Sequence, residues 1–365
     1  MKDRIEQISK YNFWKKTPPL GYLRKSYLEW LTQFNHSRLV KVLVGQRRVG
    51  KSYILRQHIN QLIENGVPAT HTLYINTEYI DFNFLVDDKS LYELIVAYQE
   101  YFKIEGEFYL FIDEIQQIKN WEKVINALSQ DFTQKIHICI TGSNSKLLSG
   151  ELSSLLSGRY VENIVFPFSY EEYTSYQKIE KSRNTYLQYL QTGGLPELFH
   201  LPNNETKQNY LKSLRDTIVL RDIIQRYSVK DPILLSDIFT YLVNNLSVLT
   251  SVTNLVNYWK SKKRKTTYET VASYMDYFTQ TYLLHQCERY DIKGKDILGG
   301  QYKYYLNDLS FVNYLFSGNQ QGLGRLLENL IFLQLRRSGF IVYVGHLRQK
   351  EIDFVTKKFD KTLYI

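Results

Sequence analysis

The feature that most constrains the fold is a glycine-bounded loop between two apolar segments, LVGQRRVGKSYIL at residues 43–55. Gly45, Gly50, Lys51 and Ser52 have the spacing G-x-x-x-x-G-K-[ST] of a phosphate-binding loop. The run before the loop is typical of a buried strand, and the segment after it is typical of a helix. Strand, loop and helix therefore follow one another in the order that such a loop requires.

Each part of this loop has an expected chemical role. The glycines let backbone N–H groups converge on phosphate oxygens, and the helix N-terminus adds the positive end of its dipole. Lys51 is expected to neutralise terminal phosphate charge and the Ser52 hydroxyl to ligate Mg²⁺. The predicted ligand of the loop is Mg-ATP. The alternative is that the motif is a chance match in an ordinary turn. The positions expected to contact the nucleotide are Gly45, Gln46, Arg47, Arg48, Val49, Gly50, Lys51, Ser52 and Tyr53.

A second apolar run, at residues 108–112, ends on the adjacent acids Asp113 and Glu114. Ligands of a parallel α/β sheet bind at the carboxyl ends of its strands, so both acids are expected beside the glycine loop. Asp113 is predicted to hold Mg²⁺ through its water shell, and Glu114 to orient or deprotonate the attacking water. The alternative is that the two acids only cap a helix.

The next apolar run, at residues 136–140, ends in TGSNS and places Ser143 and Asn144 at the same edge of the predicted sheet. Asn144 is predicted to position the attacking water or to contact the γ-phosphate, with an ordinary turn as the alternative. Arg159 follows an apolar segment that stops at Gly158. It is a candidate to stabilise charge on the transferred phosphoryl group, in its own chain or from a neighbouring subunit, and a surface salt bridge is the alternative.

Six motifs, taken in chain order, resemble those of a known family. They are GQRRVGKS, LFIDEIQ, ITGSNSKLL, LSGRY, FPFSYEEY and TGGLPELF. The resemblance is to the prokaryotic AAA-type ATPases often called the archaeal ATPase group, which are related to the signal-transduction ATPases with numerous domains, and it covers nearly the whole chain. It implies that the GGLP element begins a helical lid near the adenine, with Gly194 and Pro196 beside the base. Without the resemblance, GGLP is typical of a turn.

The chain is expected to divide into five segments. We predict an N-terminal helical lead-in (1–38), a doubly wound α/β P-loop core (39–175), a helical lid (176–228), a winged helix (229–295) and an incomplete α/β restriction-endonuclease-like region (296–365). Arg221 and Arg226 of the lid are secondary candidates for nucleotide sensors, with solvated surface charges as the alternative.

Three helical segments, a strand-like stretch and a glycine-containing turn outline the winged helix. A basic run just before its third helix is placed to face the phosphates of DNA at the edge of a major groove. Its cations are Lys260, Lys262, Lys263, Arg264 and Lys265. Two alternatives are a solvated lysine loop and packing of the winged helix against the nucleotide domain, which the family resemblance also allows.

The last segment places Glu328 on a helix and Asp353 on the second of two strands. Both positions resemble metal ligands of the restriction-endonuclease-like fold, in which a following [Glu/Gln]-x-Lys completes the Mg²⁺ site. The sequence stops at Ile365, inside an apolar stretch where that element is expected, so we predict that the region does not cut nucleic acid. The structural alternative is that Asp353 caps a β-turn and Glu328 pairs with Arg325 or a nearby lysine.

Composition narrows the class of protein. With 44% hydrophobic and 15% aromatic residues, the 365-residue chain is expected to bury a sizeable core in about two to four domains. Cys139 and Cys287 lie far apart without metal-ligand spacing, which argues against a disulfide framework or zinc site and favours the cytoplasm. Residues 1–20 lack the apolar core of a signal peptide, and no apolar stretch approaches about 18 residues, so no membrane partner is expected.

The net charge of +9 favours contact with a polyanion, with solvated lysines as the alternative. Together these features predict an AAA-type ATPase that binds Mg-ATP and hydrolyses it slowly as a molecular switch, alone, as a homo-oligomer or with a protein partner. Two further hypotheses stay open: a nucleotide-gated DNA-binding regulator in which hydrolysis is incidental, and an ATP-regulated, Mg²⁺-dependent nuclease.

Overall fold

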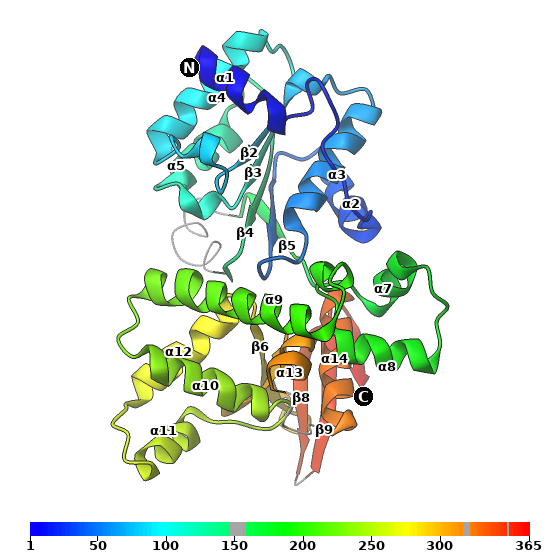
Figure 1. Ribbon diagram of the computed structural model, residues 1–365, viewed down its shortest axis with the longest axis vertical. Coiled ribbons are helices and arrows are strands. Elements are labelled where there is room, and N and C mark those ends of the chain that lie inside the picture. The colour runs from blue at the N-terminus through cyan, green and yellow to red at the C-terminus, as the bar shows by residue number, and fades with distance from the viewer. Residues whose placement is uncertain (146–155, 157, 317–321, 349) are drawn as a thin grey trace. The chain divides into compact units, whose positions relative to one another are not determined.

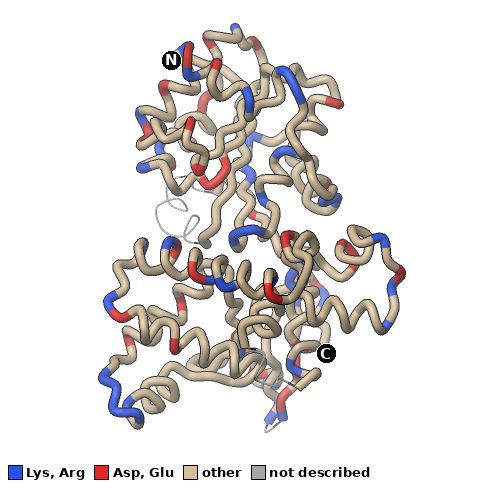
Figure 2. Tube along the Cα trace, in the orientation of Figure 1, with Lys and Arg blue, Asp and Glu red and all other residues tan. Residues whose placement is uncertain are grey.

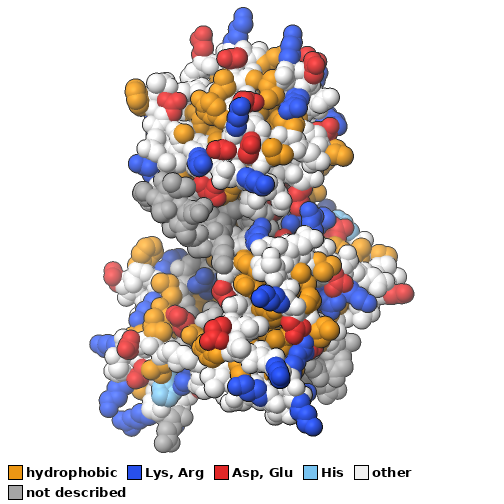
Figure 3. Space-filling model, turned by 90° about the vertical axis from the view of Figure 1, so that its left-hand side faces the viewer, with side chains coloured by type: hydrophobic (Ala, Val, Ile, Leu, Met, Phe, Trp, Pro, Cys, Tyr) orange, Lys and Arg blue, Asp and Glu red, His pale blue; other side chains and the backbone are white. Residues whose placement is uncertain are grey.

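The computed structural model describes residues 1–145, 156, 158–316, 322–348 and 350–365, which form two units (Figure 1). Unit 1 comprises Met1–Gly45 and Gly50–Val165, and unit 2 comprises Gln46–Val49 and Phe166–Ile365. Among these residues no helix combines the length and the apolar character needed to cross a membrane. On the face in Figure 3, acidic and basic side chains are interspersed over unit 1, so the net positive charge is not gathered into one patch there.

Within the described residues, unit 1 is built around a five-stranded sheet in the order β2-β3-β4-β1-β5. The strands are β1 (Val40–Val44), β2 (Thr72–Asn76), β3 (Phe108–Asp113), β4 (Ile136–Gly142) and β5 (Tyr160–Ile164). All four strand pairs are parallel, and every residue of β1 to β4 is buried. A parallel sheet covered on both faces needs such continuous apolar strands. The predicted α/β sheet is therefore confirmed.

Helices cover both faces of this sheet (Figure 1). They are α1 (Lys2–Ile8), α2 (Lys25–Thr32), α3 (Lys51–Glu64), α4 (Asp88–Phe102) and α5 (Trp121–Gln130). α2 and α3 lie on one face, and α1, α4 and α5 lie on the other. α4 begins at a capping box in which the Asp87 carboxylate accepts the Ser90 N–H at 3.0 Å. The N-terminal helices thus belong to the same unit as the sheet.

Unit 2 combines helices with a second sheet. The helices are α7 (Tyr170–Gln177), α8 (Arg183–Thr192), α9 (Asn204–Thr217), a π-helix (Ile218–Gln225), α10 (Pro232–Asn244), α11 (Val252–Ser261), α12 (Tyr268–Gln280), α13 (Ser310–Leu315) and α14 (Leu323–Arg337). The strands are β6 (Leu284–Asp291), β7 (Asp296–Leu306), β8 (Ile341–Leu347), β9 (Lys350–Lys358) and β10 (Lys361–Tyr364). Their order in the sheet is β10-β9-β8-β6-β7.

The helices α10 to α12 and the β6–β7 hairpin follow one another in the order predicted for a winged helix, but the hairpin is not an isolated wing. β6 is antiparallel to β7 and parallel to β8, with Arg289 opposite Val344. The boundary drawn between residues 295 and 296 falls between the two strands of this hairpin. The segments expected to form a winged helix and a nuclease-like region therefore share one sheet.

Candidate functional site

The loop between β1 and α3 requires glycine at both of its ends. A Cβ atom on Gly45, whose φ is 147°, would lie 2.4 Å from the carbonyl oxygen of Val165. Gly50 has a φ of 101° and immediately precedes α3. Both values lie in the left-handed region that side-chain-bearing residues rarely adopt. The spacing of the motif thus reflects two backbone positions that other residues would distort.

Lys51 is the first residue of α3, and its side chain is almost completely buried. Its Nζ donates a hydrogen bond to the Gly45 carbonyl oxygen at 2.9 Å and lies 3.3 Å from Oε1 of Glu114. The ammonium group therefore points back over the loop, toward the acids that follow β3. A phosphate would offer it a charge-assisted partner of the same kind as Glu114.

Asp113 is the last residue of β3 and is fully buried. Its Oδ2 accepts hydrogen bonds from the Tyr74 hydroxyl at 2.9 Å and from the Asn76 side-chain amide at 3.0 Å. Its Oδ1 accepts a hydrogen bond from the Thr141 hydroxyl. Donors from β2 and β4 thus hold the carboxylate in one orientation. None of these three donors was predicted, although Asn76 and Thr141 lie at the ends of apolar runs.

The electrostatics of Asp113 favour a cation beside it. Burial raises the pKa of this carboxyl group, and the neighbouring charge of Glu114 raises it further, whereas a hydrogen bond from Ser52 acts in the opposite direction. A buried carboxylate with a raised pKa is stabilised in its charged form by a nearby positive charge. The Ser52 hydroxyl and the Asp113 carboxylate together supply the oxygen ligands that Mg²⁺ prefers, so these residues fit the predicted ion.

Glu114 is buried, and its carboxylate contacts Lys51 on one side and Gln116 on the other. Its backbone is left-handed, with a φ of 55°, and its N–H donates to the Thr141 hydroxyl oxygen at 3.0 Å. Its Oε2 accepts a hydrogen bond from the Gln116 side chain at 2.6 Å. Although Glu114 precedes the short 3₁₀ helix Ile115–Gln117, its side chain makes no capping hydrogen bond. The helix-cap alternative for this residue is therefore wrong.

Ser143 and Asn144 are both buried directly after β4. Because β4 lies between β3 and β1, they share the carboxyl edge of the sheet with Asp113 and the glycine loop. The Gln116 amide lies 3.3 Å from the Ser143 hydroxyl and also donates to Glu114. The structure thus brings the polar end of β4 next to the acid predicted to act as the base.

Arg159 lies at the opposite edge of the sheet. It precedes β5, whose first residue, Tyr160, is paired in parallel with Val40 at the start of β1. The glycine loop follows the other end of β1, roughly 16 Å away for five residues at about 3.3 Å each. Arg159 is exposed, and among the described residues its guanidinium donates to the Asn126 side-chain oxygen at 3.4 Å. The prediction that Arg159 stabilises the phosphoryl group within its own chain is therefore wrong.

The middle of the loop, Gln46–Val49, is grouped with unit 2. The Arg47 guanidinium donates two hydrogen bonds, at 2.7 and 3.0 Å, to the buried carboxylate of Asp222 in the π-helix. The Gln46 side-chain oxygen accepts a hydrogen bond from Asn307 at 2.9 Å. Arg47 is therefore held by a carboxylate, which the spacing of the motif does not reveal. Tyr53, in unit 1, is exposed, with the Arg56 guanidinium 4.1 Å from its ring centroid.

The GGLP element also belongs to unit 2. The Gly194 N–H donates to the Asp308 carboxylate at 2.6 Å, and a Cβ atom on Gly194 would lie 2.2 Å from the carbonyl oxygen of Phe168. Pro196 begins a short 3₁₀ turn. The close approach of Phe168 explains why position 194 requires glycine. The expected place of Gly194 and Pro196 beside the adenine rests on the family resemblance alone. The secondary sensor candidates of this unit, Arg221 and Arg226, are exposed.

The acids predicted for a nuclease-like site do not form one. Glu328 of α14 accepts hydrogen bonds from Lys303 Nζ at 2.9 Å and from the Tyr305 hydroxyl at 2.7 Å. Lys303 also lies 2.6 Å from Oε1 of Glu351. Asp353 is exposed within β9, so it does not cap a turn. Throughout the described ranges, no three His, Cys, Asp or Glu residues are arranged to hold a metal ion.

The Lys303 ammonium thus occupies the space between two carboxylates that a cation would otherwise fill. Burial alone would lower the pKa of Lys303, but its hydrogen bonds to Glu351 and Glu328 raise this pKa overall. The pairing of Glu328 with a nearby lysine agrees with the structural alternative for that residue.

Replacing Lys303 with Met should therefore destabilise the protein. We expect the free energy of unfolding to fall by about 3 kcal/mol, the lower end of the range for removing one partner of a buried ion pair, because Glu351 is 40% exposed. Urea unfolding measures this change. Lys350→Met, an exposed lysine on β9, is the matched control, and equal stabilities of the two variants would contradict the prediction.

Comparison with known proteins covers both units. A family model described as "AAA domain" matches residues 37–174, and one described as "Domain of unknown function (DUF8612)" matches residues 183–322. An "Uncharacterized protein" of Haemophilus influenzae is 35% identical over 347 residues, 94% of this chain and 85% of its own length. The "Uncharacterized protein MJ1544" of Methanocaldococcus jannaschii is 30% identical over 335 residues, 87% of this chain and 71% of its own length.

A similar solved structure is that of "The walker-type atpase paby2304 of pyrococcus abyssi". It aligns with a TM-score of 0.52 and 16% identity, over 81% of this chain and 96% of its own. At that identity the likeness is one of fold.

Proposed function

This chain belongs to the family of the Haemophilus influenzae and Methanocaldococcus jannaschii proteins and carries an AAA domain, and from that premise we propose that it binds and slowly hydrolyses Mg-ATP. The observation that carries the proposal is the convergence of Lys51, Asp113 and Glu114 at one edge of the unit 1 sheet. Lys51 lies 3.3 Å from Glu114, and Asp113 is fully buried beside them.

We assign each residue a role in this reaction. Lys51 and the N–H groups at the start of α3 bind the terminal phosphates, while Ser52 and Asp113 hold Mg²⁺, which would neutralise phosphate charge. Glu114 accepts a proton from the attacking water. Asn144 is placed to orient that water, because it is buried at the same strand end.

Two contacts of Glu114 favour slow turnover. Its carboxylate is held by Lys51 at 3.3 Å and by Gln116 at 2.6 Å. Lys51 must exchange Glu114 for a phosphate before the carboxylate is free to take a proton. We infer that ATP binding itself releases the base, as expected for a switch whose bound state is long-lived.

Two measurements on the full chain test this function. Calorimetry with ATP and Mg²⁺ should show saturable binding, and phosphate release should then be slow but enzyme-dependent. ATP binding without any phosphate release would leave a nucleotide-gated regulator as the better description. An absence of ATP binding would refute the proposal.

The nuclease hypothesis is not retained, because Lys303 already neutralises Glu328 and Glu351. Contact with nucleic acid is retained as a second candidate function, because exposed lysines gather in the turn after α11.

A further inference from the structure

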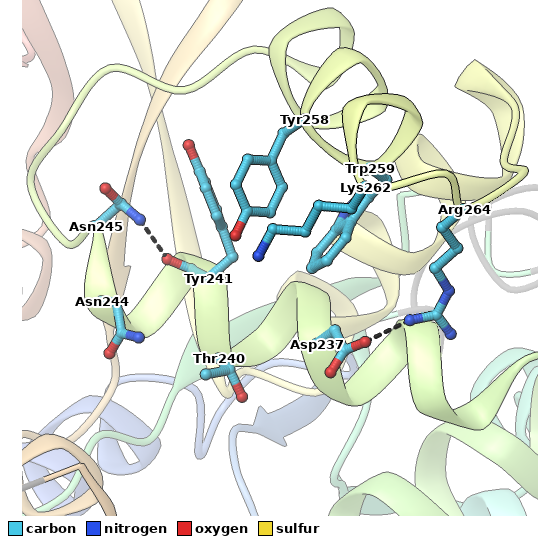
Figure 4. A pocket seen from close by; sticks show the side chains of 9 residues that line it. All are labelled: Asp237, Thr240, Tyr241, Asn244, Asn245, Tyr258, Trp259, Lys262 and Arg264. Carbon is cyan, nitrogen blue, oxygen red and sulfur yellow. Dashed lines mark hydrogen bonds and ion pairs between the residues drawn. The ribbon is translucent and has the colours of Figure 1, made fainter.

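Unit 2 contains a pocket of about 590 Å³ between α10 and α11 (Figure 4). Tyr241 and Asn244 of α10 form one side, Tyr258 and Trp259 of α11 form the other, and Lys262 lies at its rim. This volume lies within the range of about 300–1,000 Å³ that is typical of small-ligand sites.

The walls of the pocket present aromatic faces. The rings of Tyr241 and Tyr258 lie with their centroids 5.5 Å apart and their planes inclined by 52°. Lys262 extends across the pocket, and its Nζ lies 4.6 Å from the Tyr258 ring centroid (Figure 4). Since Tyr258 is 36% exposed and Lys262 is also exposed, a flat ligand reaches the Tyr258 ring by displacing only a flexible side chain.

Arg264 lines the pocket with its guanidinium paired to two carboxylates. Its guanidinium donates to the carboxylates of Asp237 and Asp231, the latter at 3.0 Å, and so ties the turn after α11 to α10. The two carboxylates neutralise its charge, and its role as a phosphate contact stays a prediction. Lys262, in contrast, has no carboxylate partner in the part of the chain that the structure describes. The pocket thus carries one positive charge available to an anion.

The chain around Lys262 carries further positive charge. Lys260, Lys262, Lys263 and Lys265 are all exposed, and Figure 2 shows this run in blue after α11. The turn that carries them is compact, because Lys263 is left-handed with a φ of 61° and its N–H donates to the Lys260 carbonyl oxygen at 2.9 Å. A mononucleotide carries its phosphate charge at one end, whereas a nucleic-acid strand brings successive phosphates to several lysines. The lysine turn therefore favours a nucleic-acid strand over a single nucleotide.

We propose that this pocket binds one unpaired base of a single-stranded nucleic acid, with the adjoining phosphates on the lysine turn. The base stacks on Tyr258 in place of Lys262, whose amino group moves to a phosphate. Stacking of this kind accepts any base, because every base has a π-face, but it excludes bases that are paired within a duplex. The site is separate from the ATP site and does not depend on the function proposed there.

Fluorescence anisotropy of the full chain with labelled oligo(dT) at low salt tests the proposal. Tyr258→Leu should weaken binding by roughly five- to a hundredfold, the loss expected for one stacking platform. Lys262→Gln should reduce the slope of log affinity against log salt by about 0.7, the value for one phosphate contact on a single strand.

Matched variants control for surface chemistry and folding. Tyr268→Leu removes an exposed aromatic ring outside the pocket, and Lys293→Gln removes an exposed lysine of the β6–β7 turn; both should bind as the parent does.

Several results would overturn the proposal. They are no binding by the parent at low salt, parent-like binding by a folded Tyr258→Leu variant, equal affinity for a duplex of the same length, and equal affinity for free thymidine monophosphate.

Discussion

Glu114→Gln should leave Mg-ATP bound and slow its hydrolysis by a factor on the order of 10² to 10⁴, the usual contribution of a general base. The substitution preserves Asp113, the assigned metal ligand, and the Glu114 backbone N–H that bonds to Thr141. It removes only the charge that accepts the proton. Because Lys51 then has no ionic partner to give up, ATP affinity should stay equal or increase.

Phosphate release and calorimetric binding, measured on the same preparation, separate these two effects. Glu100→Gln makes the same acid-to-amide change at an exposed position of α4 and should match the parent in both. Parent-like hydrolysis by the Glu114→Gln protein would remove Glu114 from the mechanism.

Lys51→Ala should weaken ATP binding by about 1.5 to 3 kcal/mol, or roughly tenfold to over a hundredfold, the value of a charge-assisted contact. The buried Lys51 ammonium lies between the Gly45 carbonyl oxygen and the Glu114 carboxylate, where it can bind a phosphate. Calorimetry with ATP and Mg²⁺ measures the loss. Lys89→Ala, an exposed lysine of α4, is the matched control.

The Lys51 variant also leaves Glu114 buried without its ion-pair partner, so its stability should fall as well. A second substitution distinguishes misfolding from loss of the phosphate contact. Lys51→Ala combined with Glu114→Gln removes the unpaired charge and should regain stability without regaining ATP affinity. Recovery of ATP affinity in this double variant would contradict the role assigned to Lys51.

The sequence predicts β1, β3 and β4 of unit 1 because buried parallel strands are largely apolar runs, whereas β2 and the partly exposed β5 were not predicted. The runs at residues 108–112 and 136–140 correspond to β3 and β4, which extend further by one and two residues. Tyr74 was missed for a different reason. Its hydroxyl reaches Asp113 only because β2 and β3 are neighbours, and strand order is not contained in a local pattern.

Strand direction explains the error about Arg159, and contacts between distant segments explain why the lysine that pairs with Glu328 could not be named. Arg159 belongs to the motif LSGRY, but it lies at the amino end of β5. Ligands of a parallel α/β sheet bind at the carboxyl ends of its strands. Lys303 lies in the strand-like segment QYKYYL. Its partners Glu328 and Glu351 belong to α14 and β9, which are distant in the sequence and contact it only in the folded unit. Charges that are paired across distant segments cannot be recognised from spacing.

The parallel pairing of β6 with β8 has a consequence for how the protein is made. Arg289 of β6 pairs with Val344 of β8, which is made later. During synthesis the β6 edge of the β6–β7 hairpin therefore has no partner strand until α14 and β8 have followed. An open strand edge is a template for pairing with other chains, and long-range parallel pairing is slow. The second sheet is therefore completed only after β8 has been made, and until then the open edge of β6 favours pairing with other copies of the nascent chain.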